Sequence, residues 1–292
     1  MRILIIDGMN ALFRAYHSYK HLQNHGKPVS VIYGMPILIN GLINQFKPDK
    51  IYICWDGKKS IHRIRILPTY KHGRKTMTAE ERAEFIKQRD TVMKVFYYLG
   101  IPQLYSTNME ADDWIYILVR KLKKDNGNKI TIVSTDKDFH QLIRSNVKIY
   151  NTVQRSLIHK ENLKIRFGYT PKNCVDFLCL TGDKSDNIPG VKGVGDSSAQ
   201  NVLNSFSSIP EFLSSHKNLP RVNKTELAAI YERNRQLIDL RYFYNTFLKG
   251  KIKLVYYGFE ENPKLDKKNL FKLCDDYEIK GFKKPEFLKN YK

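Results

Sequence analysis

The sequence predicts an α/β fold, with a mostly parallel central sheet and flanking helices, followed by a mostly helical region. Three apolar runs, RILIID, KIYICWD and KITIVSTD, have the composition of strands that are covered on both faces. Helical patterns at 33–46, 79–99 and 111–124 lie between these runs. Strands that alternate with helices are typical of a parallel sheet.

Each of the three predicted strands ends on an aspartate, namely Asp7, Asp56 and Asp136. Ligands of parallel α/β sheets bind beyond the carboxyl ends of the strands, so we expect these carboxylates to gather at one edge. Aspartate is common in turns, which would be the simpler explanation for any single strand. Its recurrence at all three strand ends favours a functional site.

Six further acids are predicted to lie near this edge. The segment MEADDW opens the helix over 111–124, STDKDFHQL follows the third strand, and GDKSDN forms a turn; they contribute Glu110, Asp112, Asp113, Asp138, Asp183 and Asp186. Acids in a first helical turn are also favoured by the helix dipole, which remains an alternative for MEADDW taken alone. Nine clustered carboxylates would repel one another unless cations neutralised them.

The type of these ligands indicates which cation would bind. Oxygen ligands without a His/Cys set favour Mg²⁺ or Mn²⁺ over zinc. Two such ions can clamp a phosphodiester, activate water and stabilise the leaving oxygen.

The overall charge predicts a polyanionic partner. The chain of 292 residues carries 50 Lys and Arg against 29 Asp and Glu, a formal net charge of +21. Nucleic acid and an acidic membrane surface both fit this charge. No apolar run is long enough to span a bilayer, the N-terminus lacks the features of a signal peptide, and no basic amphipathic helix is evident, so a peripheral membrane protein ranks last.

Cysteine usage bears on the cellular compartment. Cys54, Cys174, Cys179 and Cys274 form no CxxC pair and have apolar neighbours. They are typical of free thiols in a reducing compartment, so we expect a cytoplasmic protein.

The pattern changes after residue 170. Thr170 and Pro171 favour the start of a helix, and further helices are predicted at 196–206, 209–216, 224–235 and 235–248. Residues 263–292 are rich in lysine. We therefore expect an α/β catalytic domain over 1–180 and a helical DNA-binding region over 181–292.

A basic stretch, GKKSIHRIRILPTYKHGRK, directly follows Asp56, and a helical pattern returns at 79–90. A solvated charged loop is the plain alternative. Its position instead predicts a segment over about 57–90 that covers the acidic edge. Lys71 and Arg74 would then reach a phosphate, and Tyr70 would stack on a base.

The run GVKGVG at 190–195 is a helix–hairpin–helix signature within residues 183–206. Glycine permits tight turns and close approach of a phosphate backbone, and the amides that start the next helix can bind that phosphate. An ordinary loop is the alternative. We expect contacts to DNA from Gly190, Lys192, Gly193, Gly195 and Ser197.

Taken together, the motifs IIDGMNALFRAYH, WDGKKSIHRIR…YKHGRK, MEADDW, STDKDFHQL and GDKSDNIPGVKGVG resemble those of the structure-specific 5′ nucleases. This family includes the nuclease domain of bacterial DNA polymerase I and the free-standing flap endonucleases of bacteriophages. The resemblance covers residues 1 to about 250, and the chain length favours the free-standing type.

This resemblance implies a PIN-like catalytic domain, a helical arch over a two-metal site, and a helix–three-turn–helix that grips duplex DNA. It assigns all nine acids as metal ligands, and Lys71, Arg74 and Arg14 as basic residues near the substrate. It also implies a K⁺ ion at the backbone carbonyls of Val191 and Val194. The hairpin departs from the family, because GDSSAQ with Asp196 replaces the usual GxKTA.

The resulting prediction is a Mg²⁺-dependent 5′-3′ exonuclease and flap endonuclease, active as a monomer on DNA with 5′ flaps or ends. Asp56, Glu110 and Asp112 would chiefly hold one ion, supported by Asp7 and Asp113. Asp136, Asp138, Asp183 and Asp186 would form the second group. RNA:DNA hybrids are a further substrate class. The alternatives are an RNA-directed nuclease of the same fold and a non-catalytic protein that binds DNA junctions.

Overall fold

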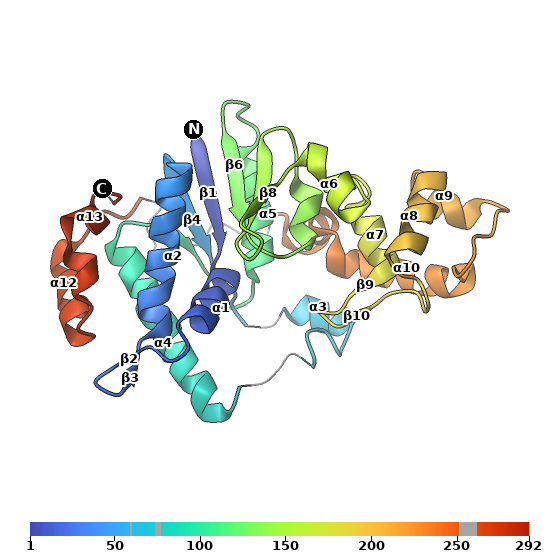
Figure 1. The fold of residues 1–292 in the computed structure, drawn as a ribbon. Coiled ribbons are helices and arrows are strands. Elements are labelled where there is room, and N and C mark those ends of the chain that lie inside the picture. Colours follow the sequence, from blue (N-terminus) through green and yellow to red (C-terminus); the bar gives the residue numbers. More distant parts are fainter. Residues whose placement is uncertain (59, 74–76, 251–261, 292) are drawn as a thin grey trace.

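The computed structural model of the chain describes residues 1–58, 60–73, 77–250 and 262–291. At its centre lies a six-stranded sheet in the order β5-β4-β1-β6-β7-β8 (Figure 1). The strands are β1 (Arg2–Asp7), β4 (Lys50–Cys54), β5 (Gln103–Leu104), β6 (Lys129–Val133), β7 (Val147–Asn151) and β8 (Ser156–Ile158). Neighbouring strands are parallel except β7 and β8, which confirms the predicted mostly parallel sheet.

Alternation along β1 divides the core into two layers, because successive side chains of a strand point to opposite faces. Leu4 and Ile6 pack toward a layer formed by α1 (Gly8–Ser18), α2 (Ser30–Phe46) and α4 (Ala79–Tyr98). Ile3 and Ile5 pack toward α5 (Ala111–Leu122) and the helices that follow the sheet. The three predicted helices of this part are confirmed within a few residues at each end.

The segment predicted to cover the acidic edge contains two helices within its described residues. After β4 the chain forms the short helix α3 (Ile61–Ile66), a turn over 67–73, and then α4. Thr78 and Glu81 form a capping box that starts α4. The first half of α4 continues beyond the ends of the strands in Figure 1. Residue 59 and residues 74–76, including Arg74, lie outside the described residues.

The region after the sheet is helical, as predicted. It contains α6 (Lys160–Phe167), α7 (Cys174–Thr181), α8 (Asp196–Ser205), α9 (Ile209–Ser214), α10 (Lys224–Ile238), α11 (Leu240–Phe243) and a π-helical turn at Tyr244–Leu248. The predicted helix start at Thr170 is wrong. The N–H of Asn173 donates to the carbonyl of Thr170, so a turn precedes the helix.

A small hairpin separates α7 from α8. Its strands are β9 (Gly182–Asp183) and β10 (Ile188–Pro189), which pair antiparallel. This hairpin lies beside α3 in Figure 1, so two segments far apart in sequence meet at the same side of the sheet. The backbone N–H of Lys71 donates to the carbonyl of Asp186 at 2.8 Å, which joins them directly.

The last thirty described residues do not join the helical region. The helices α12 (Lys267–Asp276) and α13 (Pro285–Leu288), with a 3₁₀ turn at Lys280–Lys283, lie beside α2 and α4 (Figure 1). Leu270 and Phe282 are buried in the same layer as Leu4 and Ile6. These residues therefore pack with the α/β part, whereas the predicted region 181–292 had grouped them with the helices after the sheet.

Two expectations about the chain as a whole can be compared with the structure. All four cysteines are described, buried and free, as predicted. No helix among the described residues combines the length and the apolar character needed to cross a bilayer.

Candidate metal centre and nucleic-acid interface

The carboxyl ends of the central strands bring the predicted acids together. Asp7 begins α1 and accepts hydrogen bonds from Asn10 N–H at 3.0 Å and from Ser134 Oγ at 2.8 Å. Asp56 follows β4 and accepts from Ala111 N–H at 2.6 Å, which joins it to the start of α5. Three strand ends and one helix start thus meet at one place, because the strands are parallel and adjacent.

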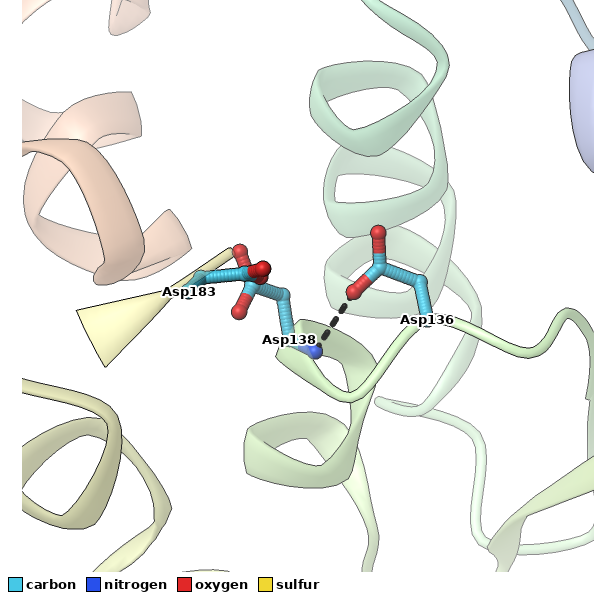
Figure 2. Close-up of side chains that lie close together, drawn as sticks. All are labelled: Asp136, Asp138 and Asp183. Carbon is cyan, nitrogen blue, oxygen red and sulfur yellow. Dashed lines mark hydrogen bonds between the residues drawn. The ribbon is translucent and has the colours of Figure 1, made fainter. Parts of the chain in front are cut away.

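A second group of carboxylates lies next to the first. Ligand oxygens of Asp136, Asp138 and Asp183 all lie within 4.8 Å of one another. Figure 2 shows the carboxylates of Asp138 and Asp183 side by side, with the carboxylate of Asp136 nearby. Asp136 is fixed by the N–H of Asp138, which donates to its Oδ1 at 2.8 Å. Asp183 Oδ1 accepts from both the N–H and the hydroxyl of Ser185 at 2.7 Å.

One oxygen of this group is oriented for a cation. Oδ1 of Asp138 is buried and has no hydrogen-bond partner among the described residues. A buried carboxylate oxygen without a partner is costly, and a bound cation removes that cost. Three carboxylates without histidine or cysteine suit a hard divalent ion. The residues present therefore fit a Mg²⁺ or Mn²⁺ site.

Mutual repulsion and burial raise the pKa values in this cluster. Burial, followed by the charge of Asp56, raises the pKa of Asp7 to about 7. Burial, together with the charges of Asp186 and Asp183, raises the pKa of Asp136 to about 6. Burial and then Asp136 raise the pKa values of Asp112 and Asp138 as well. Without cations, this group retains protons that metal binding would displace.

Glu110 differs from the other acids because cations of the chain itself surround it. Its Oε2 lies 2.9 Å from Lys71 Nζ and 3.2 Å from an Arg63 guanidinium nitrogen. Burial opposes ionisation, but Arg63 and Lys71 outweigh it and lower the pKa of Glu110 to about 2. Lys71 Nζ also lies 3.8 Å from Asp186 Oδ2, so it stands between two acids, and its predicted contact with a phosphate stays a prediction.

The backbone at Lys71 is held in an uncommon conformation. Its φ is +56°, which is unfavourable for a side chain of this size. The hydrogen bond from its N–H to the Asp186 carbonyl keeps the turn in place. Strain of this kind persists where the surrounding structure determines it, often at functional sites.

Tyr70 does not have the predicted role of stacking on a base. Its side chain is 1% exposed, and its hydroxyl lies 3.1 Å from Glu110 Oε2 and 2.8 Å from Asp186 Oδ2. The ring is enclosed in the core beside α5, so no base can reach its face. Tyr70 instead links two acids that come from different parts of the chain.

Asp113 is turned toward Arg63. Arg63 donates to both oxygens of Asp113, at 2.7 and 3.2 Å, and the N–H of Glu110 donates to Asp113 Oδ2 at 3.1 Å. Asp113 thus forms an ion pair that also caps α5, and its predicted place among the metal residues, as a support of the first ion, stays a prediction. Sequence reasoning missed Arg63, although Ile66 and Leu67 follow it at the spacing of a buried helical face.

A pocket of about 530 Å³ opens beside the acids. Asp56, Glu110 and Lys71 line one part of it, and Arg82 and Phe85 of α4 line another. Its wall thus combines the acidic site with cationic and aromatic side chains of the covering helix. That combination suits a single strand, which presents phosphates and flat bases together.

The helix–hairpin–helix turn at 190–195, which follows the β9–β10 hairpin, is tight and partly exposed. A Cβ at Gly190 would lie 2.3 Å from the carbonyl carbon of Thr181, so only glycine fits there. Gly193 has a φ of +76°, which also favours glycine. The N–H of Val191 donates to the Leu180 carbonyl and that of Val194 to the Val191 carbonyl, while both valine side chains are buried.

The other residues predicted to contact DNA lie at or near the surface. Lys192, Gly193, Gly195 and Ser197 are exposed just before α8 or in its first turn. The N–H of Lys192 donates to the Glu226 carboxylate at 2.9 Å. Arg14 is half-buried on α1.

Comparisons with protein families agree along most of the chain. Residues 2–168 match the model described as 5′-3′ exonuclease, N-terminal resolvase-like domain. Residues 169–246 match the model described as 5′-3′ exonuclease, C-terminal SAM fold. A protein named 5′-3′ exonuclease from Buchnera aphidicola subsp. Acyrthosiphon pisum is 33% identical over 245 residues, which cover 82% of this chain and 84% of that protein. A protein of the same name from Aquifex aeolicus is 31% identical over 244 residues, 82% of each chain.

Solved structures show the same fold. A complex of bacteriophage T5 flap endonuclease with DNA and metal ions has a TM-score of 0.71 at 22% identity, covering 94% of this chain and all of that one. A zinc-bound T5 5′-exonuclease has a TM-score of 0.70 at 24% identity, covering 84% of this chain and 91% of that one.

Proposed function

This chain belongs to the 5′-3′ exonuclease family and is a phosphodiester-hydrolysing nuclease, and we propose that Mg²⁺-dependent cleavage near junctions of a 5′ single strand with duplex DNA is its reaction. The observation that supports the proposal best is the convergence of carboxylates from three strand ends, α5 and β9 beside the partly buried Lys71. The products would be 5′-phosphate and 3′-hydroxyl ends.

We assign one divalent ion to Asp136, Asp138 and Asp183 and a second to Asp56, Glu110 and Asp112. When bound, the ions would activate water and neutralise charge on the leaving oxygen. Mg²⁺ is favoured because every ligand is an oxygen, and Mn²⁺ would substitute. Asp7 and Asp186 would orient the surrounding groups, since Asp7 bonds Ser134 and Asp186 bonds Tyr70.

Residues of the chain itself would position and stabilise the substrate. Lys71 places a positive charge beside Glu110 and Asp186, where the reacting phosphate must lie. Arg14 and Arg74 would bind neighbouring phosphates. The pocket beside α4 would take the single strand, and the 190–195 hairpin would take the duplex backbone. A substrate that occupies both is a junction.

The hairpin and the chain as a whole carry three further proposals. The backbone carbonyls of Val191 and Val194 would bind K⁺ when duplex DNA is present. RNA:DNA hybrids would be cleaved as well as DNA flaps, because contacts to the backbone do not read bases. A monomer in the reducing cytoplasm is the proposed form of the protein, in keeping with its four free thiols.

A 5′-labelled DNA flap tests this function. With Mg²⁺ we expect a product released near the junction, and with excess EDTA we expect none. Blunt duplex and unpaired strand of equal length are the controls for junction specificity, and a matched RNA:DNA flap tests the hybrid. Cleavage that continues undiminished in EDTA would contradict the mechanism. Tight flap binding without cleavage at any Mg²⁺ concentration would indicate a protein that only binds junctions.

A further inference from the structure

Arg63 is a buried cation directly behind the acidic site. It lies on α3, in the stretch between β4 and α4, and its side chain is 1% exposed. Ser60, which caps the same helix through a hydrogen bond from the N–H of Arg63, is 2% exposed. A cation this deeply enclosed is seldom found without a specific set of partners.

The guanidinium group of Arg63 binds two acids at once. Its two terminal nitrogens reach both oxygens of Asp113, at 2.7 and 3.2 Å, and one of them also lies 3.2 Å from Glu110 Oε2. A planar guanidinium fixes the orientation of a carboxylate that it binds through two nitrogens. Arg63 therefore fixes how Asp113 and Glu110 lie relative to each other.

Arg63 is also one of three groups that hold one oxygen of Glu110 within the protein. Oε2 is surrounded by donors from Arg63, Lys71 and Tyr70, at 3.2, 2.9 and 3.1 Å. Oε1 accepts a long hydrogen bond from Ser60 N–H at 3.5 Å and from no cation among the described residues. A cation would thus meet Oε1, while Oε2 stays held within the protein.

A third contact connects Arg63 with the helical region. The central carbon of its guanidinium group lies 3.9 Å from the centre of the Phe243 ring on α11. Phe243 is itself 1% exposed, so this stacking is shielded from solvent and strengthened accordingly. The neighbouring His62 stacks on Phe247 with ring centres 4.8 Å apart. Helix α3 is thereby fixed between the acids and α11.

We propose that Arg63 is a positioning residue for the nuclease reaction: it orients Glu110 for the divalent cation and links that orientation to the helical region through Phe243. This inference rests on the proposed function for its catalytic part. The rival explanation is a purely structural ion pair, whose loss would lower stability but leave each folded molecule with the same cation site and the same cleavage rate.

The variant Arg63→Lys distinguishes the two explanations, because it keeps the positive charge but loses the planar guanidinium group. A lysine cannot hold both oxygens of Asp113 and Glu110 Oε2 in one plane. We expect Mn²⁺ affinity to fall about tenfold and the single-turnover cleavage rate to fall between about 10- and 100-fold, the range for residues that support metal ligands. The affinity for flap DNA in Ca²⁺ should stay within about threefold, because Arg63 cannot touch DNA.

Phe243→Leu removes the aromatic face while leaving an apolar side chain of similar size. It tests the link to α11, and we expect a smaller change of the same kind, a cleavage rate lowered about threefold or more. Arg166→Lys is the matched control. Arg166 also lies over a phenylalanine ring, Phe167 at 5.6 Å, and donates to Gln154 and Ser156, but it belongs to α6.

The experiment measures Mn²⁺ binding by electron paramagnetic resonance without DNA, single-turnover cleavage at saturating DNA and metal, and thermal unfolding. Lower Mn²⁺ affinity and slower cleavage in folded Arg63→Lys, with Arg166→Lys like the parent, support the proposal. Parental values for both in Arg63→Lys, with only a lower melting temperature, overturn it. If Arg63→Lys does not fold, Phe243→Leu decides by the same measurements.

The design also distinguishes this inference from the proposed function. A parental protein that binds Mn²⁺ but cleaves no flap would refute the function. The Mn²⁺ affinities of the variants would still decide whether Arg63 positions Glu110.

Discussion

The two halves of the acidic cluster are stabilised in opposite ways. Glu110 and Asp113 are paired inside the protein with Arg63, and Glu110 also with Lys71, so the pKa of Glu110 is lowered to about 2. The group of Asp136, Asp138 and Asp183 forms no such ion pair within the described part of the chain, and the pKa of Asp136 is raised to about 6. In the first half the chain itself supplies cations beside the carboxylates, whereas the second half retains protons until ions from solution replace them.

This difference explains how these five acids coexist beside the sheet without unfolding it. Buried like charges are tolerated when they are paired or when they retain protons. The chain uses pairing where the acids contact α3 and the turn that follows it, and protonation in the group of Asp136, Asp138 and Asp183. The internal pairs preserve the shape of the site before metal arrives, which preorganises it for the reaction.

The largest effect is expected from Asp138→Asn, in the half without internal cations. The amide keeps the shape but removes the charge at the oxygen for which the described residues supply no hydrogen-bond partner. Cleavage should fall to less than about one thousandth, because the charge that holds the ion is lost. Flap DNA binding, measured by fluorescence anisotropy in Ca²⁺, should stay within a few-fold. Cleavage at the parental rate would remove Asp138 from the site.

Lys71→Ala tests the role of the cation that lies between Glu110 and Asp186. It removes the ammonium group that lies 2.9 Å from Glu110 and 3.8 Å from Asp186. Single-turnover cleavage should slow by about a hundredfold, the range for loss of one charge-stabilising donor. Circular dichroism should show a folded protein, since Arg63 still neutralises Glu110. Lys71→Arg is the companion variant and should recover part of the rate.

Asp113→Asn tests the internally paired half, where the loss of stability should be larger than the loss of metal binding. The variant leaves Arg63 with Glu110 as its remaining carboxylate, and we expect about 3 kcal/mol less stability in urea unfolding. Mn²⁺ affinity should fall far less than in Asp138→Asn. An equal loss of affinity in the two variants would mean that Asp113 is a ligand after all.

The positions of the acids could be predicted from the sequence, whereas their hydrogen-bond and ion-pair partners could not. The strand-end positions of Asp7, Asp56 and Asp136 follow from parallel pairing, because adjacent parallel strands end at the same edge. The tight turn at 190–195 could also be predicted, because the glycines of GVKGVG favour positive φ angles. Gly193 has such an angle in the structure.

The partners of the acids could not be predicted in the same way. Arg63, Tyr70 and Asp113 owe their roles to contacts between segments about forty to fifty residues apart, or more than a hundred in the case of Tyr70 and Asp186. A basic stretch has the composition of a solvated loop, and burial of one arginine or tyrosine within it depends on tertiary packing. The same limit applies to the C-terminal helices, whose lysine content gave no sign of their position beside α4.

The smallest expected effect is on how the stability of the folded protein depends on pH. In the metal-free protein the pKa values of Asp7 and Asp136 are about 7 and 6, against an ordinary value of 3.8 in the unfolded chain. Between about pH 4 and pH 7 the folded state therefore binds more protons than the unfolded state. These groups make the folded protein less stable as pH rises through that range.

Added Mg²⁺ should oppose this trend, because the ion replaces the protons that the cluster releases. We expect Mg²⁺ to raise the melting temperature by several degrees at pH 8 and by about a degree or less at pH 5, when scanning calorimetry compares protein in Mg²⁺ with protein in EDTA. Asp138→Asn is the control, and its Mg²⁺ response should be small at both pH values. An equal response of the parent at pH 5 and pH 8 would show that both halves of the cluster are already neutralised within the chain, and the distinction between them would fail.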